Sequence, residues 1–320
     1  MILTVTPNPC VDKTVFIDEL RVGSFMRSPR YTCIPGGKGT NVSRAIKNLG
    51  RDTRALVVVG GHPGAHVVDM IEQQDGVECV PVWVGDQTRT ITTVLEEKSH
   101  RQTAFFEPGP RVTPEEERNI EEMFCLALAG ARVVTFNGTV PDPAISGIYT
   151  RLIRHAADAG AFTVLDAHGP ELGLGVDAAP FMCKPNIAEA EELVGYALDT
   201  DKSRLEAVDW FHAKGVKLVV LSLGKGGAII SDGATRLRAV PPEINEVNPV
   251  GSGDAVVAGF AIGLMEGMSL HNTARLAIAA GAANAMSWDI GHFDRALVEN
   301  LSSQVQIIRF ECAGETPAPQ

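Results

Sequence analysis

The sequence predicts an α/β fold: a doubly wound, mostly parallel sheet with helices on both faces, and a small β-sheet lid beside it. Short β-branched runs alternate with amphipathic, helix-like segments along most of the chain, an order typical of parallel sheets. Residues 11–34 and 77–107 break this order, because within each range strand-like stretches follow one another without an intervening helix. We therefore expect one domain over 1–310, with 311–320 as a flexible tail.

The strands and helices follow from apolar periodicity. Continuous β-branched runs are typical of buried parallel strands, and we expect such strands at 2–6, 55–59, 132–136, 162–165, 218–222 and 228–231. Helical spacing of apolar residues predicts helices over 40–49, 113–129 and 272–285. Gly50 is expected to stop the first of these helices. The Thr-Pro-Glu-Glu start of the second supplies an N-cap, a proline and two acids.

The lid is predicted from alternation with a period of two. Residues 88–97 read TRTITTVLEE, which suits a sheet with one face in water. We interpret 11–34 and 77–107 as a β element that projects from the main domain and serves as a lid, as a homodimer surface or as both. The alternative is a pair of edge hairpins.

Charge and composition argue against several classes of partner. The chain of 320 residues has a net charge of −11, whereas proteins that bind nucleic acid or anionic membranes are normally basic. The six cysteines include no C-x-x-C pair, which makes a zinc site a weak interpretation. Scattered cysteines, no signal peptide and no apolar run long enough to cross a bilayer predict a reduced, cytoplasmic protein.

Polar or glycine-rich segments follow four predicted strands. They are Asn137-Gly138-Thr139, Asp166, Lys184-Pro185-Asn186 and the glycine-rich residues 223–227. In an open α/β sheet, ligands bind beyond the carboxyl ends of the strands. Four such segments on one edge therefore indicate a binding site.

Common nucleotide, hydrolase and zinc motifs are absent from the sequence. There is no Walker A loop, no Rossmann glycine fingerprint and no G-x-S-x-G elbow. His62 and His66 are four residues apart, but Pro63 and Gly64 between them are expected to break a helix. We therefore interpret both histidines as loop residues.

The stretch NPVGSGDAVVAGF carries the most specific chemistry. Its apolar half predicts a buried helix, so the residues before it lie at a helix N-terminus, where free amides and the dipole favour an anion. Asp254 is then either an N-cap or a general base. As a base it would accept the proton of an attacking hydroxyl while the amides of Gly251, Ser252 and Gly253 hold a phosphoryl group.

A second glycine turn, GGKGTN at 36–41, precedes the helix predicted at 40–49. It is either a tight strand-to-helix turn with a solvated lysine or a site where the backbone approaches a polyhydroxy ligand. In the second interpretation, Lys38 and Asn41 supply hydrogen bonds.

These two turns together resemble the ribokinase-like (PfkB) family of sugar kinases. Residues 36–42 are similar to its N-terminal signature, and residues 248–259 are similar to its C-terminal signature, whose aspartate is the catalytic base. The two motifs occur in the family's order, and the resemblance covers residues 1 to about 300. It implies that Asp254 is the base.

The resemblance implies roles for further residues. The K-P-N-x-x-E match implies that Asn186 and Glu189 organise Mg²⁺ through water and phosphate contacts. The implied substrate-binding residues are Asp12, Gly36, Gly37, Lys38 and Asn41. The implied ATP-binding residues are Lys184, Asn186, Ser222, Gly224, Gly226, Gly227 and Asn284.

Within the family, the opening ILTVTPNPCVD and the pair Thr88-Arg89 are similar to the branch of 1-phosphofructokinase and tagatose-6-phosphate kinase. In that branch the matching arginine holds the phosphate that the substrate already carries. Arginine suits this role because it binds phosphate in a bidentate fashion. We expect Arg89 on the lid, with Lys38 and Arg27 as helpers.

Four residues depart from the pattern of this branch. Thr139 stands where the branch has a serine that contacts phosphate, and Asn137 and Asp142 are unusual beside it. His168 stands where a small residue is common. These departures leave the identity of the sugar open.

The resemblance implies transfer of the γ-phosphoryl group of Mg²⁺-ATP to a hydroxyl of a ketohexose phosphate, which gives a bisphosphate. Fructose 1-phosphate, tagatose 6-phosphate and fructose 6-phosphate are the candidate substrates. One alternative is a kinase of an unphosphorylated sugar or nucleoside, and another is a non-catalytic sensor of a sugar phosphate or nucleotide. A monovalent cation is a further candidate cofactor.

Overall fold

The computed structural model describes residues 1–99 and 101–310. In this part of the chain, the main sheet has the strand order β14-β13-β12-β11-β10-β9-β8-β1-β4-β5. The strands from β11 to β5 in this order run parallel, and β12, β13 and β14 extend the sheet in an antiparallel fashion. Their bounds are β1 Ile2–Thr6, β4 Thr53–Val59, β5 Glu78–Trp83, β8 Val133–Asn137, β9 Phe162–Asp166, β10 Met182–Cys183, β11 Leu218–Ser222, β12 Ala228–Ser231, β13 Arg236–Val240 and β14 Gln306–Arg309.

Helices cover both faces of this sheet. On one face lie α1, α2, α8, α9 and α10, and on the other lie α3 to α7. Their bounds are α1 Lys38–Asn48, α2 Gly61–Gln73, α3 Pro114–Ala127, α4 Ile148–Asp158, α5 Pro170–Val176, α6 Ile187–Val194, α7 Asp201–Ala213, α8 Ser252–Glu266, α9 Leu270–Ala285 and α10 Arg295–Gln304. The predicted doubly wound, mostly parallel fold is confirmed.

The central strands of the main sheet are largely apolar, and they are buried on both sides. Along β1, Ile2 joins the core beneath α8 and α9, whereas Leu3 and Val5 join the core beneath α3 and α4. A strand with two buried faces reads as a continuous apolar run, which is why these strands could be predicted from the sequence.

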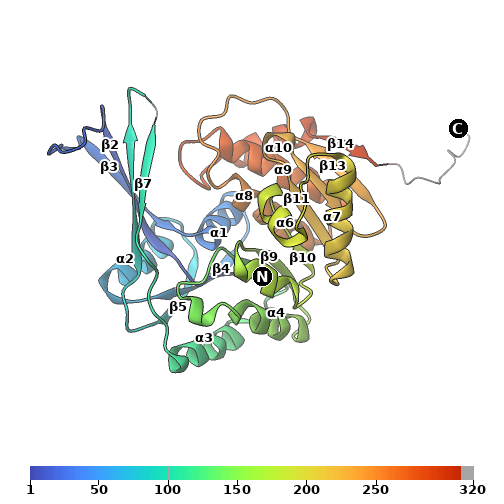
Figure 1. The fold of residues 1–320 in the computed structure, drawn as a ribbon, viewed down its shortest axis with the longest axis horizontal. Coiled ribbons are helices and arrows are strands. Elements are labelled where there is room, and N and C mark those ends of the chain that lie inside the picture. The colour runs from blue at the N-terminus through green and yellow to red at the C-terminus, as the bar shows by residue number, and fades with distance from the viewer. Residues whose placement is uncertain (100, 311–320) are drawn as a thin grey trace, which may run out of the picture.

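A separate four-stranded sheet projects from this body (Figure 1). Its order is β3-β2-β6-β7, with bounds β2 Cys10–Ile17, β3 Arg30–Gly36, β6 Arg89–Glu96 and β7 Gln102–Phe106. The pair β2–β6 is parallel and the other pairs are antiparallel. The lid boundary predicted at residue 77 is wrong, because β5 pairs with β4 at the edge of the main sheet.

The predicted helix signals have mixed outcomes. Thr113 caps α3 in a reciprocal capping box with Glu116, as its sequence predicts. The interpretation of His62 and His66 as loop residues is wrong, because both lie in α2. Pro63 is the third residue of that helix, where its missing N–H would have had no intrahelical acceptor.

Residues 1–99 and 101–310 include no helix that is long and apolar enough to span a bilayer. The five cysteines among them are free thiols. The predicted flexible tail, 311–320, lies outside the described residues.

Candidate active site

The carboxyl ends of the parallel strands bring the predicted polar segments to one edge of the main sheet. In register, Asn137 at the end of β8 pairs with Asp166 at the end of β9, and Lys184 follows β10. The segment after β11 lies beside the one after β10, because Asn186 bridges to Ser222. The helices α1 and α8 begin at this edge with Lys38 and Ser252.

A buried carboxylate between two lysines forms the centre of the site. Asp166 is fully buried, and its Oδ1 lies 3.3 Å from Lys38 Nζ and 3.2 Å from Lys184 Nζ. Burial alone would raise the pKa of Asp166, but the two lysines hold that pKa below its ordinary value. Burial likewise opposes the charge on Lys38, yet Asp166 above all raises the pKa of this lysine. Lys38 is therefore held at the sheet edge in its charged form, with Lys184 on the other side of the same carboxylate.

Asp254 is the third residue of α8 and is buried. Gly251 occupies the N-cap position with a φ of 82°, and the cap makes no side-chain hydrogen bond. Instead of capping, Asp254 accepts through Oδ2 from Nδ2 of Asn41 at 2.8 Å. The interpretation of Asp254 as an N-cap is thus excluded.

The electrostatic setting of Asp254 suits a base. Burial, and after it the charge of Asp166, raises the pKa of Asp254 to about 6. The lysines Lys38 and Lys184 and the hydrogen bond from Asn41 act in the opposite direction. A carboxylate with this pKa is ionised at neutral pH and still holds a proton better than an ordinary aspartate.

Two glycines at the start of α8 lie close to neighbouring side chains. A side chain on Gly251 would overlap Ile290, and its positive φ is a conformation that other residues rarely adopt. A Cβ on Gly253 would lie 3.4 Å from Lys184 Nζ, so this lysine stands directly at the helix N-terminus. Ser252 uses its own amide in a turn to the carbonyl of Pro249 at 3.2 Å.

Asn284, on α9, holds this turn through hydrogen bonds of its side chain. Its Nδ2 donates to the Val250 carbonyl at 2.8 Å and to Ser252 Oγ at 3.2 Å, and its Oδ1 accepts from the Gly291 amide at 2.7 Å. The side chain is buried. The structure thus gives Asn284 a role in holding the turn, and its part in binding ATP stays a prediction.

Asp12 and the glycine turn lie together where the lid meets the sheet. Asp12 is on β2, and a Cβ on Gly36 of β3 would come within 2.8 Å of Asp12 Cβ. Gly37 is the N-cap residue of α1. Burial raises the pKa of Asp12, while Arg44 and Arg89 lower it. The charges of both arginines thus favour the ionised form of this carboxylate.

Arg89 begins β6 of the lid and lies against the segment after β1. Its Nη2 donates to the carbonyl of Asn8 at 3.0 Å, and its buried Nε has no partner within the described residues. Asn8 Nδ2 in turn donates to Thr139 Oγ1 at 3.3 Å. The ion pairs found within 1–99 and 101–310 include none for Arg89. The guanidinium thus lies half-buried without a counter-ion.

Most of the residues predicted to bind ATP and metal follow β10 and β11, whereas Asp12 and Arg89 lie on β2 and β6 of the small sheet. Asn186 and Glu189 form a reciprocal capping box at the start of α6, with hydrogen bonds of 2.8 and 2.9 Å. The glycine-rich loop after β11 contains a short 3₁₀ turn over Gly224–Gly226, and Gly227 follows it with a φ of 83°. Gly224 is exposed and Ser222 is half-buried.

Arg27, His168 and Asp142 stand apart from this group, whereas Asn137 lies at the sheet edge beside Asp166. Arg27 is exposed in the loop between β2 and β3, and His168 is exposed after β9. Asp142 caps the 3₁₀ turn Pro143–Ile145 by accepting from the amide of Ala144. Asn137 is buried, and its Nδ2 donates to Thr135 Oγ1 at 2.8 Å. The last two departures from the pattern of the branch therefore have local structural roles.

Sequence reasoning gave no role to two residues of the site. Asp166 was recognised only as a polar strand end, although both lysines depend on it. Arg44 was missed altogether, although it lies on the buried side of α1 three residues after Asn41 and bonds to its side chain at 3.1 Å. The residues at helical spacing from Arg44, such as Asn41 and Asn48, are polar, so the sequence gives no signal that this side chain is buried.

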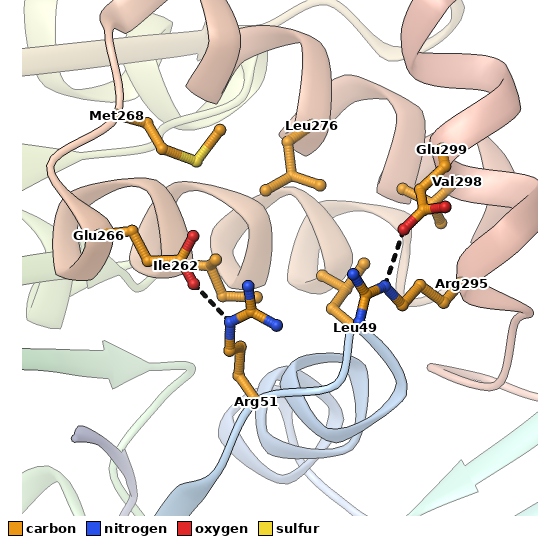
Figure 2. Close-up of a pocket in the computed structure, with 9 residues that line it drawn as sticks. All are labelled: Leu49, Arg51, Ile262, Glu266, Met268, Leu276, Arg295, Val298 and Glu299. Carbon is orange, nitrogen blue, oxygen red and sulfur yellow. Dashed lines mark hydrogen bonds and ion pairs between the residues drawn. The ribbon is translucent and has the colours of Figure 1, made fainter.

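A cavity of about 170 Å³ opens at the opposite ends of α1 and α8 (Figure 2). Arg51 pairs there with Glu266, and Arg295 pairs with Glu299 at 2.8 Å. Because both arginines are already paired with glutamates, we assign this cavity no part in binding the substrates.

Comparisons with known proteins agree with the geometry of the site. The sequence profile of the pfkB family carbohydrate kinases matches residues 5–287. The chain belongs to the PfkB family of carbohydrate kinases. The predicted family is therefore confirmed, and with it the phosphotransferase class. Tagatose-6-phosphate kinase of Staphylococcus epidermidis (strain ATCC 12228) is 30% identical to this PfkB kinase over 311 residues, which are 96% of this chain and 99% of that protein.

The PfkB kinase is also similar in structure to phosphofructokinase-2 from Escherichia coli. That enzyme has been solved in complex with substrates and products, in complex with potassium and in a tetrameric inhibited form. The three structures are 27 to 28% identical to this chain, cover 95% of it and 98% of their own chains, and have TM-scores of 0.87 to 0.89. The ribokinase-like fold is thereby confirmed.

Proposed function

We propose that this PfkB kinase transfers the γ-phosphoryl group of ATP to a hydroxyl of a ketohexose phosphate. The observation that carries the proposal is Arg89, a half-buried guanidinium whose Nε has no partner within the described residues. Arg89 donates to the carbonyl of Asn8, whose side chain contacts Thr139, and its charge lowers the pKa of Asp12. Among the described residues, no carboxylate lies within ion-pairing distance of this guanidinium, so a bound anion would compensate its charge. The phosphate already on the sugar supplies it, while Asp12 remains for the sugar hydroxyls.

The transfer itself is assigned to the start of α8. Asp254 accepts the proton of the attacking hydroxyl, and Asn41, which donates to Asp254 at 2.8 Å, keeps the carboxylate in place. The amides of the first turn and Lys184 stabilise the charge on the moving phosphoryl group. Lys38, tied to Asp166, carries a second positive charge into the same region.

ATP is assigned to the side of the sheet edge that contains α6 and the loop after β11. Lys184, Asn186, Ser222, Gly224, Gly226 and Gly227 line this side. Mg²⁺ would neutralise the charges of the phosphates. The oxygen donors of Asn186 and Glu189 fit such an ion through water: their capping box uses only Oε2 of the glutamate, which leaves Oε1 for a metal-bound water. A monovalent cation is the second cofactor proposed, and its only support is the potassium complex of the Escherichia coli enzyme.

The lid is proposed to cover the sugar and to form a homodimer interface. Its loop and outer strands expose large apolar side chains, which a monomer rarely leaves in water. They are Val22, Phe25, Tyr31, Phe105 and Phe106. The tetrameric form of the Escherichia coli relative supports an oligomer in general. Arg27 lies in the same exposed loop as Phe25, so it belongs to this surface in the isolated chain.

Replacement of Arg89 tests the proposed substrate class. Arg89→Gln keeps hydrogen-bonding capacity and removes the charge, so KM for a sugar phosphate should rise by about 30-fold or more, because one charged phosphate contact is lost. KM for ATP should change less than about twofold. Lys217→Gln, on a residue outside the site, is the control for a lost surface charge.

The same variant distinguishes the alternatives. If the natural substrate is a neutral sugar or a nucleoside, Arg89→Gln will leave its KM unchanged. If the protein is a sensor, no ADP will appear with any sugar or nucleoside, although ligands bind. Either result would contradict the proposal.

A further inference from the structure

Arg44 is the most completely buried charged side chain of α1. It is 1% exposed, and its Nε pairs with Oδ1 of Asp75, which follows α2, at 2.8 Å. Both side chains of the pair are almost inaccessible to water. A buried ion pair brings little net stability, because its desolvation offsets the attraction between the charges. Tertiary stability alone therefore does not explain why an arginine stands here.

The other hydrogen bonds of Arg44 all go to parts of the site. Nη1 donates to Oδ1 of Asn41 at 3.1 Å and to the carbonyl of Ile290 at 3.1 Å, and Nη2 donates to the carbonyl of Pro35 at 2.8 Å. Pro35 directly precedes the glycine turn at 36–37. Ile290 is the residue whose side chain a Cβ on Gly251 would overlap.

The bond to Asn41 decides which way its amide points. The Oδ1 and Nδ2 atoms of an asparagine can exchange places by rotation about one bond. Because Arg44 is a pure donor, it can bond only to the oxygen, and this leaves Nδ2 to face Oδ2 of Asp254 at 2.8 Å. In the flipped orientation, Asn41 would present an acceptor to a carboxylate, and the hydrogen bond would be lost.

We propose that Arg44 is a positioning residue for phosphoryl transfer: it orients Asn41 toward Asp254 and ties the sugar-side turn at Pro35 to the loop at Ile290. This inference rests on the proposed function, in which Asp254 is the base. The planar guanidinium matters here because its fork donates in several fixed directions at once, which a lysine cannot do.

The contacts run from Arg44 through Asn41 to Asp254, and charged groups lie near both Arg44 and Asp254. These charges determine how the ionisation of Asp254 depends on pH. Asp254 faces Asp166, Lys38 and Lys184. Arg44 faces Asp75, Asp12 and His292. Loss of the Asn41 bond removes a donor that favours the charged form of Asp254, so the proton should be held more tightly and the base should be lost at a higher pH.

The test is the double variant Arg44→Met/Asp75→Asn. It removes both charges together, so neither is left buried alone and the net charge near the site is unchanged. We expect kcat/KM for the sugar phosphate to fall by about 10- to 100-fold, with KM for ATP unchanged within about twofold. Ile153→Ala, a fully buried residue of α4, is the control for lost stability alone and should retain wild-type kcat/KM.

A second measurement does not depend on turnover. In protein labelled with ¹³C at the aspartate carboxyls, the resonance missing from Asp254→Asn identifies Asp254. Its titration midpoint should move to higher pH in the double variant. If the double variant does not fold, Arg44→Lys, which keeps the charge and loses the fork, should give the same direction of shift and the same fall in kcat/KM.

One result would overturn the inference, and a different result would refute the proposed function on which it rests. An Asp254 midpoint and a kcat/KM that match those of Ile153→Ala would mean that the pair is tertiary packing only. A wild-type protein that releases no ADP with any sugar phosphate would refute the proposed function, whereas the ¹³C titration would still report whether Arg44 acts on Asp254.

Discussion

At the scale of single residues, the proposed chemistry depends on a buried carboxylate whose hydrogen-bond donor is a neutral amide. Asp254 bonds to Asn41, while the nearby lysines Lys38 and Lys184 pair with Asp166. In the proposed reaction, the lysines bring positive charge for the phosphates without fully neutralising the base. The spacing of two carboxylates around two cations separates a base from a structural counter-ion.

Removal of the base should abolish turnover without disrupting the fold. Asp254→Asn keeps an oxygen that accepts from Asn41, so it should still bind ATP, while kcat falls by about 1,000-fold or more because no group accepts the proton. Steady-state kinetics with a calorimetric titration of ATP measure both quantities. A variant with near-normal kcat would refute the assignment of the base.

The raised pKa of Asp254 has a consequence for activity at low pH. The base works only when ionised, so kcat/KM should fall as the pH decreases through about 6. An ordinary aspartate would keep the enzyme active to nearly two units lower. A pH profile of kcat/KM with a limb near pH 4 would mean that the environment of Asp254 is not the one described.

The raised pKa of Asp254 also affects stability: ionisation of this carboxyl, which activity requires, destabilises the fold. A carboxyl whose pKa rises on folding, from an ordinary 3.8 to about 6, favours the folded state below pH 4. This contribution is lost as the pH rises through 6. Asp254→Asn should therefore increase the free energy of unfolding, and the gain should grow between pH 4 and 6 to at most about 3 kcal/mol. Urea unfolding at pH 5 and pH 8 measures the gain, and a loss of stability at pH 8 would contradict it.

The sequence predicted the residues of the site that lie in short motifs, and it missed those that act across the fold. Asp254, Asn41 and Lys184 stand in local glycine or proline patterns with a physical meaning. Arg44 and Asp166 have no such pattern: their roles come from partners up to 246 and 128 positions away. Only tertiary structure brings those partners together.

At the scale of elements, helix starts carry most of the site. The first turns of α1, α6 and α8 all lie at the carboxyl edge of the sheet, where unpaired amides collect. The sequence predicted α1 and α8 from glycine turns before apolar runs. It did not predict α2, because Pro63 was judged as a helix breaker when it occupies the first turn, where proline is tolerated.

The capping box of α6 can be separated from a role in metal binding. Glu189→Gln keeps an oxygen for the Asn186 amide, so the melting temperature should not change, whereas loss of the negative charge should raise the Mg²⁺ concentration for half-maximal activity by about tenfold or more. Glu116→Gln makes the same change in the capping box of α3 and should have no effect on Mg²⁺. Equal Mg²⁺ dependence in both variants would assign Asn186 and Glu189 to helix capping alone.

At the scale of the whole molecule, the two sheets carry different parts of the proposed site. The main sheet and its helices form the edge on which Asp254, the two lysines and the glycine turns lie. The four-stranded sheet supplies Asp12 and Arg89 from β2 and β6. The sequence predicted both sheets, but it assigned β5 to the wrong one, because an edge strand of a parallel sheet and a strand of a lid have the same local pattern.

The lid should also determine the oligomeric state. We expect the wild-type protein to be a homodimer at micromolar concentration, because dimerisation would cover the apolar side chains exposed on the lid. Phe25→Glu/Phe105→Glu should weaken the dimer by about 30-fold or more. Leu126→Glu, an exposed residue on α3, should not. Sedimentation velocity measures all three proteins, and a wild-type monomer would refute the proposed interface.

The central claim is that the acceptor carries a phosphate before the reaction. It is tested most directly by a coupled assay of ADP release, with the product identified by mass spectrometry, across fructose 1-phosphate, tagatose 6-phosphate, fructose 6-phosphate, the matching neutral sugars and a nucleoside. We predict a hexose bisphosphate from at least one sugar phosphate, with kcat/KM at least about 100-fold above that for any neutral acceptor. A neutral sugar or nucleoside as the best acceptor, or no ADP at all, would contradict the claim.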